Sequence, residues 1–269
     1  MFDKQPIIEL KNVTKKFDET RNAKPLIAVK DLSLSVDQEA AGQFVVLLGP
    51  SGCGKSTVLS LLSGLLTADE GEVRLFGEPV TGPNLHSATV PQAYTCFPWL
   101  TALGNAEFGL SIQGKSKTER QELATEYLTK VGLGDRLYAF PKELSGGMQQ
   151  RVAIARTLAM KPPILLMDEP FGALDAQTRA EMQQLLLDLW AEEKNTIIFV
   201  THDITEALFL ADRIIVFSRP AQIVEDLAVR FTRPRLPMLL RDEEFMNLSG
   251  SLLGLLKAQQ MGEVKIGEL

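Results

Sequence analysis

The sequence predicts an α/β fold built on a mostly parallel sheet. Short, uninterrupted apolar runs alternate with helical patterns along the chain, and the runs occupy residues 44–48, 164–167, 197–200 and 214–217. Strands that alternate with helices favour a parallel sheet covered on both faces. The stretch 49–57 (GPSGCGKST) fits a phosphate-binding loop and lies between a strand end and a helix start, as that motif requires.

Composition narrows the class of protein. The chain has 269 residues, 45% of them hydrophobic and 23% charged, which is enough for one large α/β domain or two smaller ones. A formal net charge of −6 gives no support to nonspecific nucleic-acid binding. Cys53 and Cys96 form neither a metal-ligand spacing nor a disulfide framework. We expect reducing surroundings, no secretory signal and, since no apolar run approaches roughly 18 residues, no membrane-spanning helix.

The remaining elements follow from local patterns. Alternation predicts strands, listed in chain order, at 8–13, 32–36, 73–76 and 88–90. Helical spacing predicts helices at 56–66, 117–131, 146–159 and 178–193. Capping boxes are expected at Thr178 with Glu181 and at Asp203 with Glu206. Residues from about 93 to 160 are helix-like, which predicts a helical insertion into the sheet domain, and a further helix-like segment ends near Lys257.

The phosphate-binding loop has a direct chemical interpretation. Gly49 and Gly54 let the backbone wrap a phosphate without a Cβ in the way, and the following helix start offers free N–H groups. Lys55 adds positive charge at the outer phosphates, and the Ser56 hydroxyl is a ligand for Mg²⁺. The competing interpretation is a chance match, which the flanking strand and helix disfavour.

Two carboxylates follow the apolar run at 164–167. The carboxyl ends of parallel strands face the ligand crevice, where the phosphate-binding loop also lies. We therefore assign Asp168 to Mg²⁺ and Glu169 to polarising the attacking water. The alternative is that both residues only cap the turn at 170–172. A second Gly-rich helix entry, at 144–151, places Ser145 and two glycines where an anion could bind, although by itself this pattern is a structural cap.

Taken together, these motifs resemble an ATP-binding cassette (ABC) ATPase over about residues 7–230. Residues 49–57 resemble its Walker A, 144–150 (LSGGMQQ) its signature and 164–169 its Walker B with the catalytic glutamate. The resemblance extends to a Q-loop glutamine, a D-loop, a switch histidine and an adenine-stacking aromatic, which correspond to Gln92, residues 173–175, His202 and Phe17.

The resemblance implies a set of site residues. Catalytic roles fall to Glu169, His202, Lys55 and Gln92, and Mg²⁺ ligation to Ser56, Gln92 and Asp168. Nucleotide contacts fall to Phe17, Gly49, Pro50, Ser51, Gly52, Cys53, Gly54, Lys55, Ser56, Thr57, Ser145, Gly146, Gly147, Gln149 and Asp175. Several have plainer readings: Phe17 as a core or hairpin aromatic, His202 as a neighbour of a helix cap, and Cys53 as a small filler. Gln92 alone is uninformative.

The resemblance also implies an architecture and partners. It implies a P-loop NTPase (RecA-like) core with an antiparallel β subdomain on the N-terminal side and an α-helical subdomain inserted at about 93–160. The ATPase domain would span 1–230, and 231–269 would be a short tail. ATP, with Mg²⁺, would lie between the phosphate-binding loop of one subunit and the signature of a second cassette. Partners would be integral membrane permease subunits and, through the assembled complex, a substrate-binding protein, at the cytoplasmic face of the inner membrane.

Within the family, the chain resembles ATPases of nitrate, sulfonate, taurine and bicarbonate importers. Pro98–Trp99 after the Q-loop, the style of residues 168–175 and a tail too short for an added regulatory domain indicate that group. Two features depart from the usual pattern of that importer group: the segment Val90–Pro91–Gln92, and Gly104, a glycine that we expect in mid-helix. The alternatives are an importer of another substrate class, a cassette ATPase of translation or DNA maintenance, and an inactive scaffold cassette.

Overall fold

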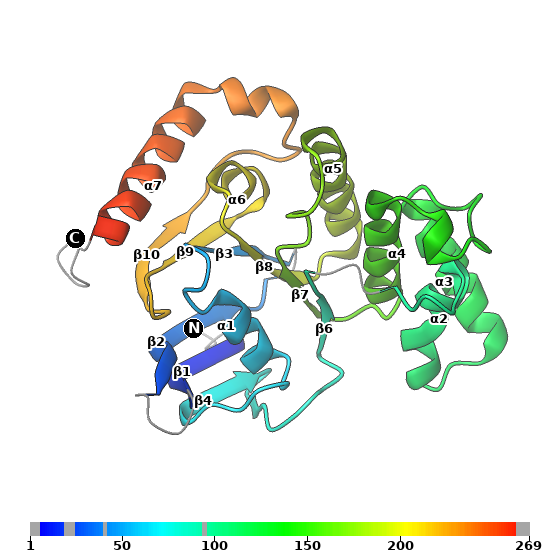
Figure 1. Cartoon of the computed structure of the whole chain (residues 1–269), viewed down its shortest axis with the longest axis horizontal. Helices are drawn as coiled ribbons and strands as arrows, with labels where there is room; N and C mark the ends of the chain where they lie inside the picture. The colour runs from blue at the N-terminus through cyan, green and yellow to red at the C-terminus, as the bar shows by residue number, and fades with distance from the viewer. Residues whose placement is uncertain (1–5, 19–24, 40–41, 93–95, 262–269) are drawn as a thin grey trace. The chain divides into compact units, whose positions relative to one another are not determined.

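The computed structural model describes residues 6–18, 25–39, 42–92 and 96–261. The chain forms two compact units: unit 1 comprises residues 1–84 and 196–269, and unit 2 comprises residues 85–195. Figure 1 shows the elements of both. Among the described residues, every helix is too short or too polar to cross a bilayer.

An antiparallel sheet opens unit 1. Its strand order is β2-β1-β4-β5, and its strands are β1 (Pro6–Phe17), β2 (Leu26–Asp37), β4 (Glu70–Leu75) and β5 (Glu78–Pro79). Along β2 the apolar side chains Leu32, Leu34 and Val36 are buried between exposed neighbours, the alternation that a sheet with one covered face requires. The predicted antiparallel β subdomain on the N-terminal side is confirmed.

Unit 1 also holds the parallel strands that carry the phosphate-binding loop. The central strand β3 (Phe44–Leu48) pairs in parallel with β8 (Thr196–Thr201) on one side and β9 (Arg213–Phe217) on the other, while β10 (Ile223–Ala228) pairs antiparallel with β9. All five β3 side chains are fully buried, so the run is hydrophobic without alternation. The strand ends at Leu48, directly before the loop.

The described part of unit 1 also holds the helices α1 (Lys55–Leu62), α6 (Ile204–Leu210) and α7 (Glu243–Met261) and the 3₁₀ turn η2 (Pro237–Arg241). The prediction that the first helix runs to residue 66 is wrong. Gly64 has φ +75, and a Cβ there would lie 1.9 Å from the carbonyl oxygen of Gly82, so the chain must turn at this point. Leu65, just after this turn, is 68% exposed.

Unit 2 pairs two parallel strands, β6 (Ser87–Val90) and β7 (Ile164–Asp168). Its helices are α2 (Ala102–Ile112), α3 (Lys117–Lys130), the 3₁₀ turn η1 (Pro141–Glu143), α4 (Gly146–Leu158) and α5 (Ala176–Glu193). Helices α2, α3 and α4 pack on one another (Figure 1). The predicted α/β class, mostly parallel sheet and α-helical subdomain are confirmed, whereas the boundaries 93–160 and 230 stay predictions, and residue 93 lies outside the described residues.

Two local predictions in unit 2 are wrong. The helix predicted to begin at Thr178 starts at Ala176, because Asp175 is its N-cap and accepts a hydrogen bond from the Thr178 backbone N–H at 3.0 Å. Gly104 does not lie in mid-helix: it is in the first turn of α2, and its N–H donates to the Thr101 hydroxyl cap at 3.1 Å. A glycine in the first turn does not interrupt the helix interior, so Gly104, which departs from the usual pattern of the importer group, costs little stability.

Candidate functional site

The phosphate-binding loop depends on its glycines. Gly54, the N-cap of α1, has φ +116, and a Cβ there would lie 2.2 Å from the carbonyl oxygen of Ala28 on β2. At Gly49 a Cβ would lie 2.9 Å from the carbonyl oxygen of Phe217 at the end of β9. The neighbouring strands therefore press against the loop backbone, and only glycine fits at both positions.

The Lys55 side chain folds back against the start of the phosphate-binding loop. This side chain is buried, with a residue exposure of 4%, and its Nζ donates to the carbonyl oxygens of Gly49 at 2.7 Å and Pro50 at 3.0 Å. The long side chain thus folds back so that its ammonium group lies among the loop carbonyls. A positive charge fixed at this place, beside the backbone N–H groups of a helix start, is suited to an outer phosphate.

The other loop residues divide by exposure. Ser51, Gly52 and Ser56 are exposed, Thr57 is partly exposed, and Cys53 is buried. Burial raises the pKa of the Cys53 thiol, so the side chain is a neutral core group. This agrees with the interpretation of Cys53 as a small filler, and any contact of this residue with a phosphate would go through its backbone.

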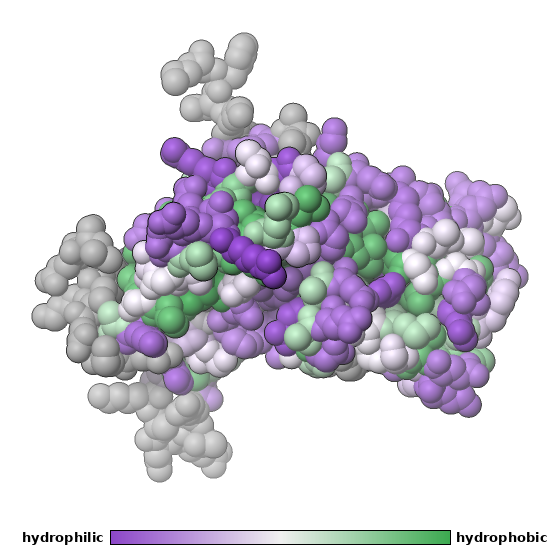
Figure 2. All heavy atoms as spheres, turned by 90° about the horizontal axis from the view of Figure 1, so that it is seen from above, coloured by the Kyte–Doolittle hydropathy of each residue, from purple (hydrophilic) through white to green (hydrophobic). Residues whose placement is uncertain are grey.

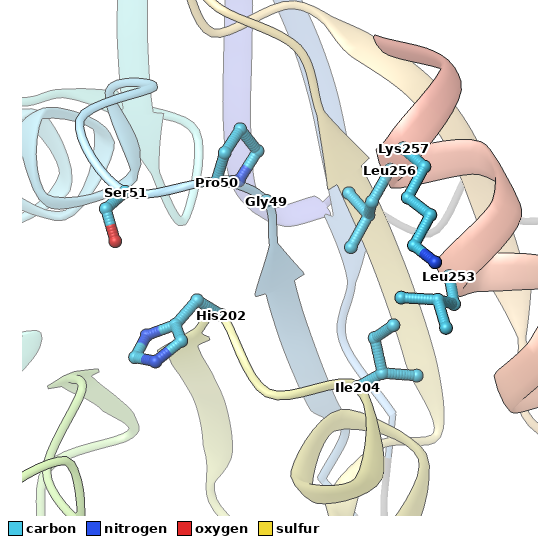
Figure 3. A pocket seen from close by; sticks show the side chains of 8 residues that line it. All are labelled: Gly49, Pro50, Ser51, His202, Ile204, Leu253, Leu256 and Lys257. Atoms are coloured by element: carbon cyan, nitrogen blue, oxygen red, sulfur yellow. The ribbon is translucent and has the colours of Figure 1, made fainter. Parts of the chain in front are cut away.

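His202 lies on the same side of unit 1 as the loop. It follows β8 and precedes α6, whose N-cap Asp203 accepts from the Glu206 N–H at 3.0 Å, so the predicted cap at Asp203 is confirmed. The Asp203 N–H donates to the Thr201 hydroxyl at 3.0 Å. A cavity of about 540 Å³ is bounded by the phosphate-binding loop, His202 and helix α7 (Figure 3); its lining residues are Gly49, Pro50, Ser51, His202, Ile204, Leu253, Leu256 and Lys257. The structure thus brings two predicted motifs together around one space.

No functional role was predicted for the α7 residues that line this cavity. Leu253, Leu256 and Lys257 come from the segment predicted to be a short tail, and Figure 3 shows them facing the cavity from the helix opposite Gly49 and His202. Nothing local in the sequence signals this wall, because the α7 residues are about 200 positions from Gly49 and about 50 from His202 in the chain. Phe17 ends β1 and is 36% exposed, with the Lys15 ammonium 5.8 Å from its ring centroid.

The acidic pair lies in unit 2, at the end of β7. The four residues before Asp168 are fully buried and Asp168 is partly exposed, so the carboxylate lies at the carboxyl end of the strand. Glu169 has φ +40, a left-handed conformation that is strained for a residue with a Cβ. The Gly172 N–H donates to its carbonyl oxygen at 3.1 Å and closes the turn. Strain of this kind is typical of functional positions.

The signature segment has a built geometry. Ser145 is exposed and caps α4 by accepting from the Met148 N–H at 3.3 Å. Gln149 turns back, and its Nε2 donates to the carbonyl oxygens of Pro141 at 2.9 Å and Leu144 at 3.2 Å. Its side-chain amide therefore shapes the turn before the helix. A Cβ on Gly147 would lie 2.7 Å from the Thr178 methyl group of α5, which explains the small residue there.

Two further predicted residues are on the surface of unit 2. Gln92 is exposed in a bend two residues after β6, and Asp175 is exposed at the start of α5. Both Asp175 oxygens contact Thr178, at 3.0 Å to its N–H and 2.7 Å to its hydroxyl, and these hydrogen bonds lower the pKa of the carboxyl group. Asp175 is therefore an ionised helix cap, and a contact with nucleotide stays a prediction.

The candidate metal ligands suit Mg²⁺ by their chemistry. Ser56 offers a hydroxyl oxygen, Gln92 an amide oxygen and Asp168 a carboxylate, all hard oxygen donors of the kind that this ion prefers. Asp168 is partly exposed at a strand end rather than buried in apolar surroundings. Among the described residues, no cluster of three or more His, Cys, Asp and Glu side chains forms a competing site for a softer metal.

Comparison with known proteins agrees with this geometry. The ABC transporter family model matches residues 29–172. The nitrate import ATP-binding protein NrtD of Synechocystis is 42% identical over 89% of this chain and 92% of its own length. The taurine import ATP-binding protein TauB of Yersinia pestis is 47% identical over 76% of this chain and 79% of its own length.

A solved structure has the same fold. The ATP-binding cassette MJ0796, in a dimeric post-hydrolysis state bound to ADP and Pi, superimposes with a TM-score of 0.72 and 36% identity over 84% of this chain and all of that chain. Together with the phosphate-binding loop and the acidic strand end, these matches settle the family. The chain belongs to the ABC transporter family, as an ATP-binding subunit that couples ATP hydrolysis to transport.

Proposed function

We propose that this chain drives the import of a small oxyanion, namely nitrate, a sulfonate such as taurine, or bicarbonate, through a partner permease. The observation that carries the proposal is the similarity over most of the chain to proteins named as nitrate and taurine import ATP-binding proteins. The Pro98–Trp99 pair after Gln92, which resembles that importer group, supports the same substrate class.

The loop residues of unit 1 would bind the triphosphate. The N–H groups at the start of α1 would donate to the phosphate oxygens, and the Lys55 ammonium, already held by the carbonyls of Gly49 and Pro50, would offset the negative charge. Phe17 would stack on adenine. Pre-ordering of Lys55 supports this assignment, because a side chain that is already fixed loses little entropy on binding.

Ser56, Gln92 and Asp168 would hold Mg²⁺, which when bound neutralises phosphate charge and orients the β- and γ-phosphates. Glu169 would accept a hydrogen bond from a water molecule and take up its proton as the water oxygen bonds to the γ-phosphorus. The bond from that phosphorus to the bridging oxygen breaks, and ADP leaves with the bridging oxygen. His202, exposed beside the loop, would donate a hydrogen bond to a γ-phosphate oxygen. Asp168 ends β7, His202 follows β8 and Ser56 is in the first turn of α1, and these positions at element ends support the proposed roles.

A second cassette would complete the site. Ser145 and the N–H groups of Gly146 and Gly147 are at the exposed start of α4 and would contact the γ-phosphate bound to the other subunit. The dimeric state of MJ0796 with ADP and Pi supports this arrangement. ATP binding would close the pair and hydrolysis would open it, which gives the permease two states to follow.

An aromatic surface on unit 2 would contact the permease at the cytoplasmic face of the membrane. Trp99 is 71% exposed, and its ring centroid is 5.6 Å from that of Phe97, which in turn is 4.6 Å from that of Phe108 on α2. Apolar patches are visible between polar residues on the helical unit in Figure 2. Exposed aromatic groups of this kind favour a protein partner.

A buried amide orders that surface. Asn105 on α2 is fully buried; its Oδ1 accepts from the Phe97 N–H at 2.7 Å, and its Nδ2 donates to the carbonyl oxygens of Phe97 at 3.2 Å, Leu100 at 3.2 Å and Thr101 at 3.0 Å. One side chain thus satisfies four backbone groups of the loop that presents Trp99. A preorganised loop loses less entropy when a partner binds.

Uptake by reconstituted vesicles tests the proposal. The chain, copurified with its permease and supplied with the substrate-binding protein, should drive ATP-dependent accumulation of nitrate, taurine or bicarbonate, and the Glu169→Gln complex should not. ATP-dependent accumulation of none of these anions, together with accumulation of a sugar or an amino acid, would overturn the substrate class. Stable association of the chain with ribosomes or DNA instead of a permease would overturn the transport role itself.

A further inference from the structure

We propose that Arg235, in the segment predicted to be a short tail, is a positioning residue for His202 and acts through helix α6. The inference rests on the role proposed above for His202. After β10, residues 231–236 lie against the carboxyl end of α6 and lead into η2 and α7.

Arg235 caps α6 with a charged side chain. Its residue exposure is 2%, and its Nη1 donates to the carbonyl oxygens of Leu208 at 3.3 Å, Phe209 at 3.1 Å and Ala211 at 2.6 Å. The last carbonyls of a helix have no partner within the helix, and a cation at that end also interacts favourably with the helix dipole. A planar guanidinium can serve several of these carbonyls at once.

Arg233 fixes the same corner to the central strand. Its Nη2 donates to the carbonyl oxygen of Leu210 at 2.7 Å and to Asp212 Oδ1 at 2.7 Å. The other Asp212 oxygen accepts from the Phe44 N–H at 2.9 Å, and the Asp212 N–H donates to the Phe44 carbonyl oxygen at 2.8 Å. Phe44 is the first residue of β3, the strand that ends at the phosphate-binding loop.

The two ends of α6 are therefore fixed in different ways. Arg233 and Arg235 hold its carboxyl end to the start of β3, and its amino end, capped by Asp203, directly follows His202. The helix has seven residues, Ile204–Leu210, or about 10 Å at 1.5 Å per residue, so a displacement of the capped end moves the histidine end with it. Arg233 and Arg235 together donate five hydrogen bonds to backbone carbonyl oxygens, which gives the connection little freedom.

The same segment also sets the wall of the cavity beside the loop. The Phe231 and Phe245 ring centroids are 5.6 Å apart, which ties the start of α7 to the irregular segment before Arg233, and α7 contacts α6. Farther along α7, Leu256 and Lys257 line the cavity with Gly49 and His202 (Figure 3). The segment after Arg230 is therefore built into the nucleotide-binding side of unit 1.

The charges that face Arg235 explain how it is tolerated in the interior. Burial and the neighbouring Arg233 lower its pKa to about 10, while Asp212, with Oδ1 3.7 Å from its Nη2, acts in the opposite direction. The group stays protonated at neutral pH, where a positive charge is what the carbonyls of α6 require.

The test compares full-length variants at positions 235 and 241. Arg235→Gln should shift the His202 imidazole signals in NMR spectra and lower kcat for ATP at least about fivefold, with KM changed less than about twofold because the phosphate-binding loop is untouched. Arg235→Lys keeps the charge but has fewer hydrogen-bond donors, so its His202 signals and its kcat should lie between those of Arg235→Gln and the wild type. The exposed Arg241, in the same segment, supplies the matched control Arg241→Gln, which should behave like the wild type. The chain has two histidines, His86 and His202, so His86→Gln assigns the signals.

Thermal melts show whether each variant is folded at the temperature of the assay. If Arg235→Gln is unfolded at that temperature, Arg233→Gln replaces it, because the Arg233 side chain is one-quarter exposed and its loss removes fewer buried contacts. Unchanged His202 signals and unchanged kcat in a folded variant would overturn the proposal. His202→Ala separates this result from the proposed mechanism: normal kcat in His202→Ala would refute the role of the histidine, while the NMR shift would still decide whether Arg235 positions it.

Discussion

The Lys55 Nζ donates a hydrogen bond to the carbonyl oxygen of Gly49 at 2.7 Å, six residues earlier in the chain. The ammonium group is thus ordered before any phosphate arrives. Because the lysine is both buried and charged, it needs these carbonyl partners in the free protein, and an incoming phosphate gains a fixed positive charge.

Lys55→Ala should weaken ATP binding at least tenfold, since a hydrogen bond to a charged group contributes roughly 1.5–3 kcal/mol. Titration with a fluorescent ATP analogue measures the change. Lys117→Ala, at an exposed position at the start of α3, removes the same charge elsewhere and should leave the affinity unchanged. Equal affinities for the two variants would show that another group neutralises the phosphates.

Gly54→Ala should abolish ATP binding and lower the melting temperature. The new Cβ would meet the Ala28 carbonyl oxygen at 2.2 Å, and φ +116 alone costs an L-residue roughly 1–3 kcal/mol. Gly82→Ala is the control, because a Cβ there has no atom within 4 Å and its φ is unexceptional. Differential scanning fluorimetry with and without ATP compares them. A Gly54→Ala protein that ATP still stabilises would disprove the steric argument.

Asp69 should make stability depend on pH. The Lys16 N–H and the Lys15 ammonium, at 2.6 Å and 3.0 Å from its oxygens, lower the pKa of this carboxyl group below its usual value of 3.8. A carboxyl whose pKa is lower in the folded state stabilises the fold fully above the unfolded-state pKa, and the contribution disappears as pH falls through the folded-state pKa.

Asp69→Asn should therefore reduce the free energy of unfolding at pH 7, and its deficit should shrink as pH falls below about 4. Urea unfolding at a series of pH values measures the difference. Asp135→Asn is the control, since its side chain is 75% exposed and pairs only with the adjacent Arg136 among the ion pairs of the described residues. A deficit that stays constant down to pH 3 would refute the assignment.

Trp99→Ala should lose permease binding while ATP binding and folding stay intact, because the indole is 71% exposed and its removal leaves no cavity in a core. Copurification with the permease from detergent extracts measures the loss. Leu85→Ala, also in unit 2 and 69% exposed, should copurify normally. Full complex formation and transport by Trp99→Ala would exclude this residue from the permease contact.

The sequence was informative wherever a structure depends on neighbours in the chain. The phosphate-binding loop, the cap at Asp203 and the acidic end of β7 all follow from residues within one short segment. The start of α5 was mispredicted because Asp175 and Thr178 are both good caps three residues apart, and their relative strength depends on the folded backbone.

Contacts between distant segments could not be predicted. The apolar period of α1 continues to Leu65, but the approach of Gly82 to Gly64 ends the helix earlier. Likewise, nothing near Arg235 in the sequence indicates that it caps α6, 24 to 27 residues before it. Long-range packing of this kind overrides local pattern, and it brings α7 to the cavity beside the phosphate-binding loop.

Size-exclusion chromatography with light scattering, performed on Glu169→Gln with ATP, tests the shared nucleotide site most directly. A general base typically contributes 10²–10⁴-fold, roughly, to the rate, so this variant should retain ATP and accumulate as a dimer. Glu169→Gln combined with Ser145→Arg should bind ATP but remain a monomer, because Ser145 would contact the nucleotide of the other subunit. If the double variant also forms an ATP-dependent dimer, Ser145 does not lie at the shared nucleotide and the two-subunit site is wrong.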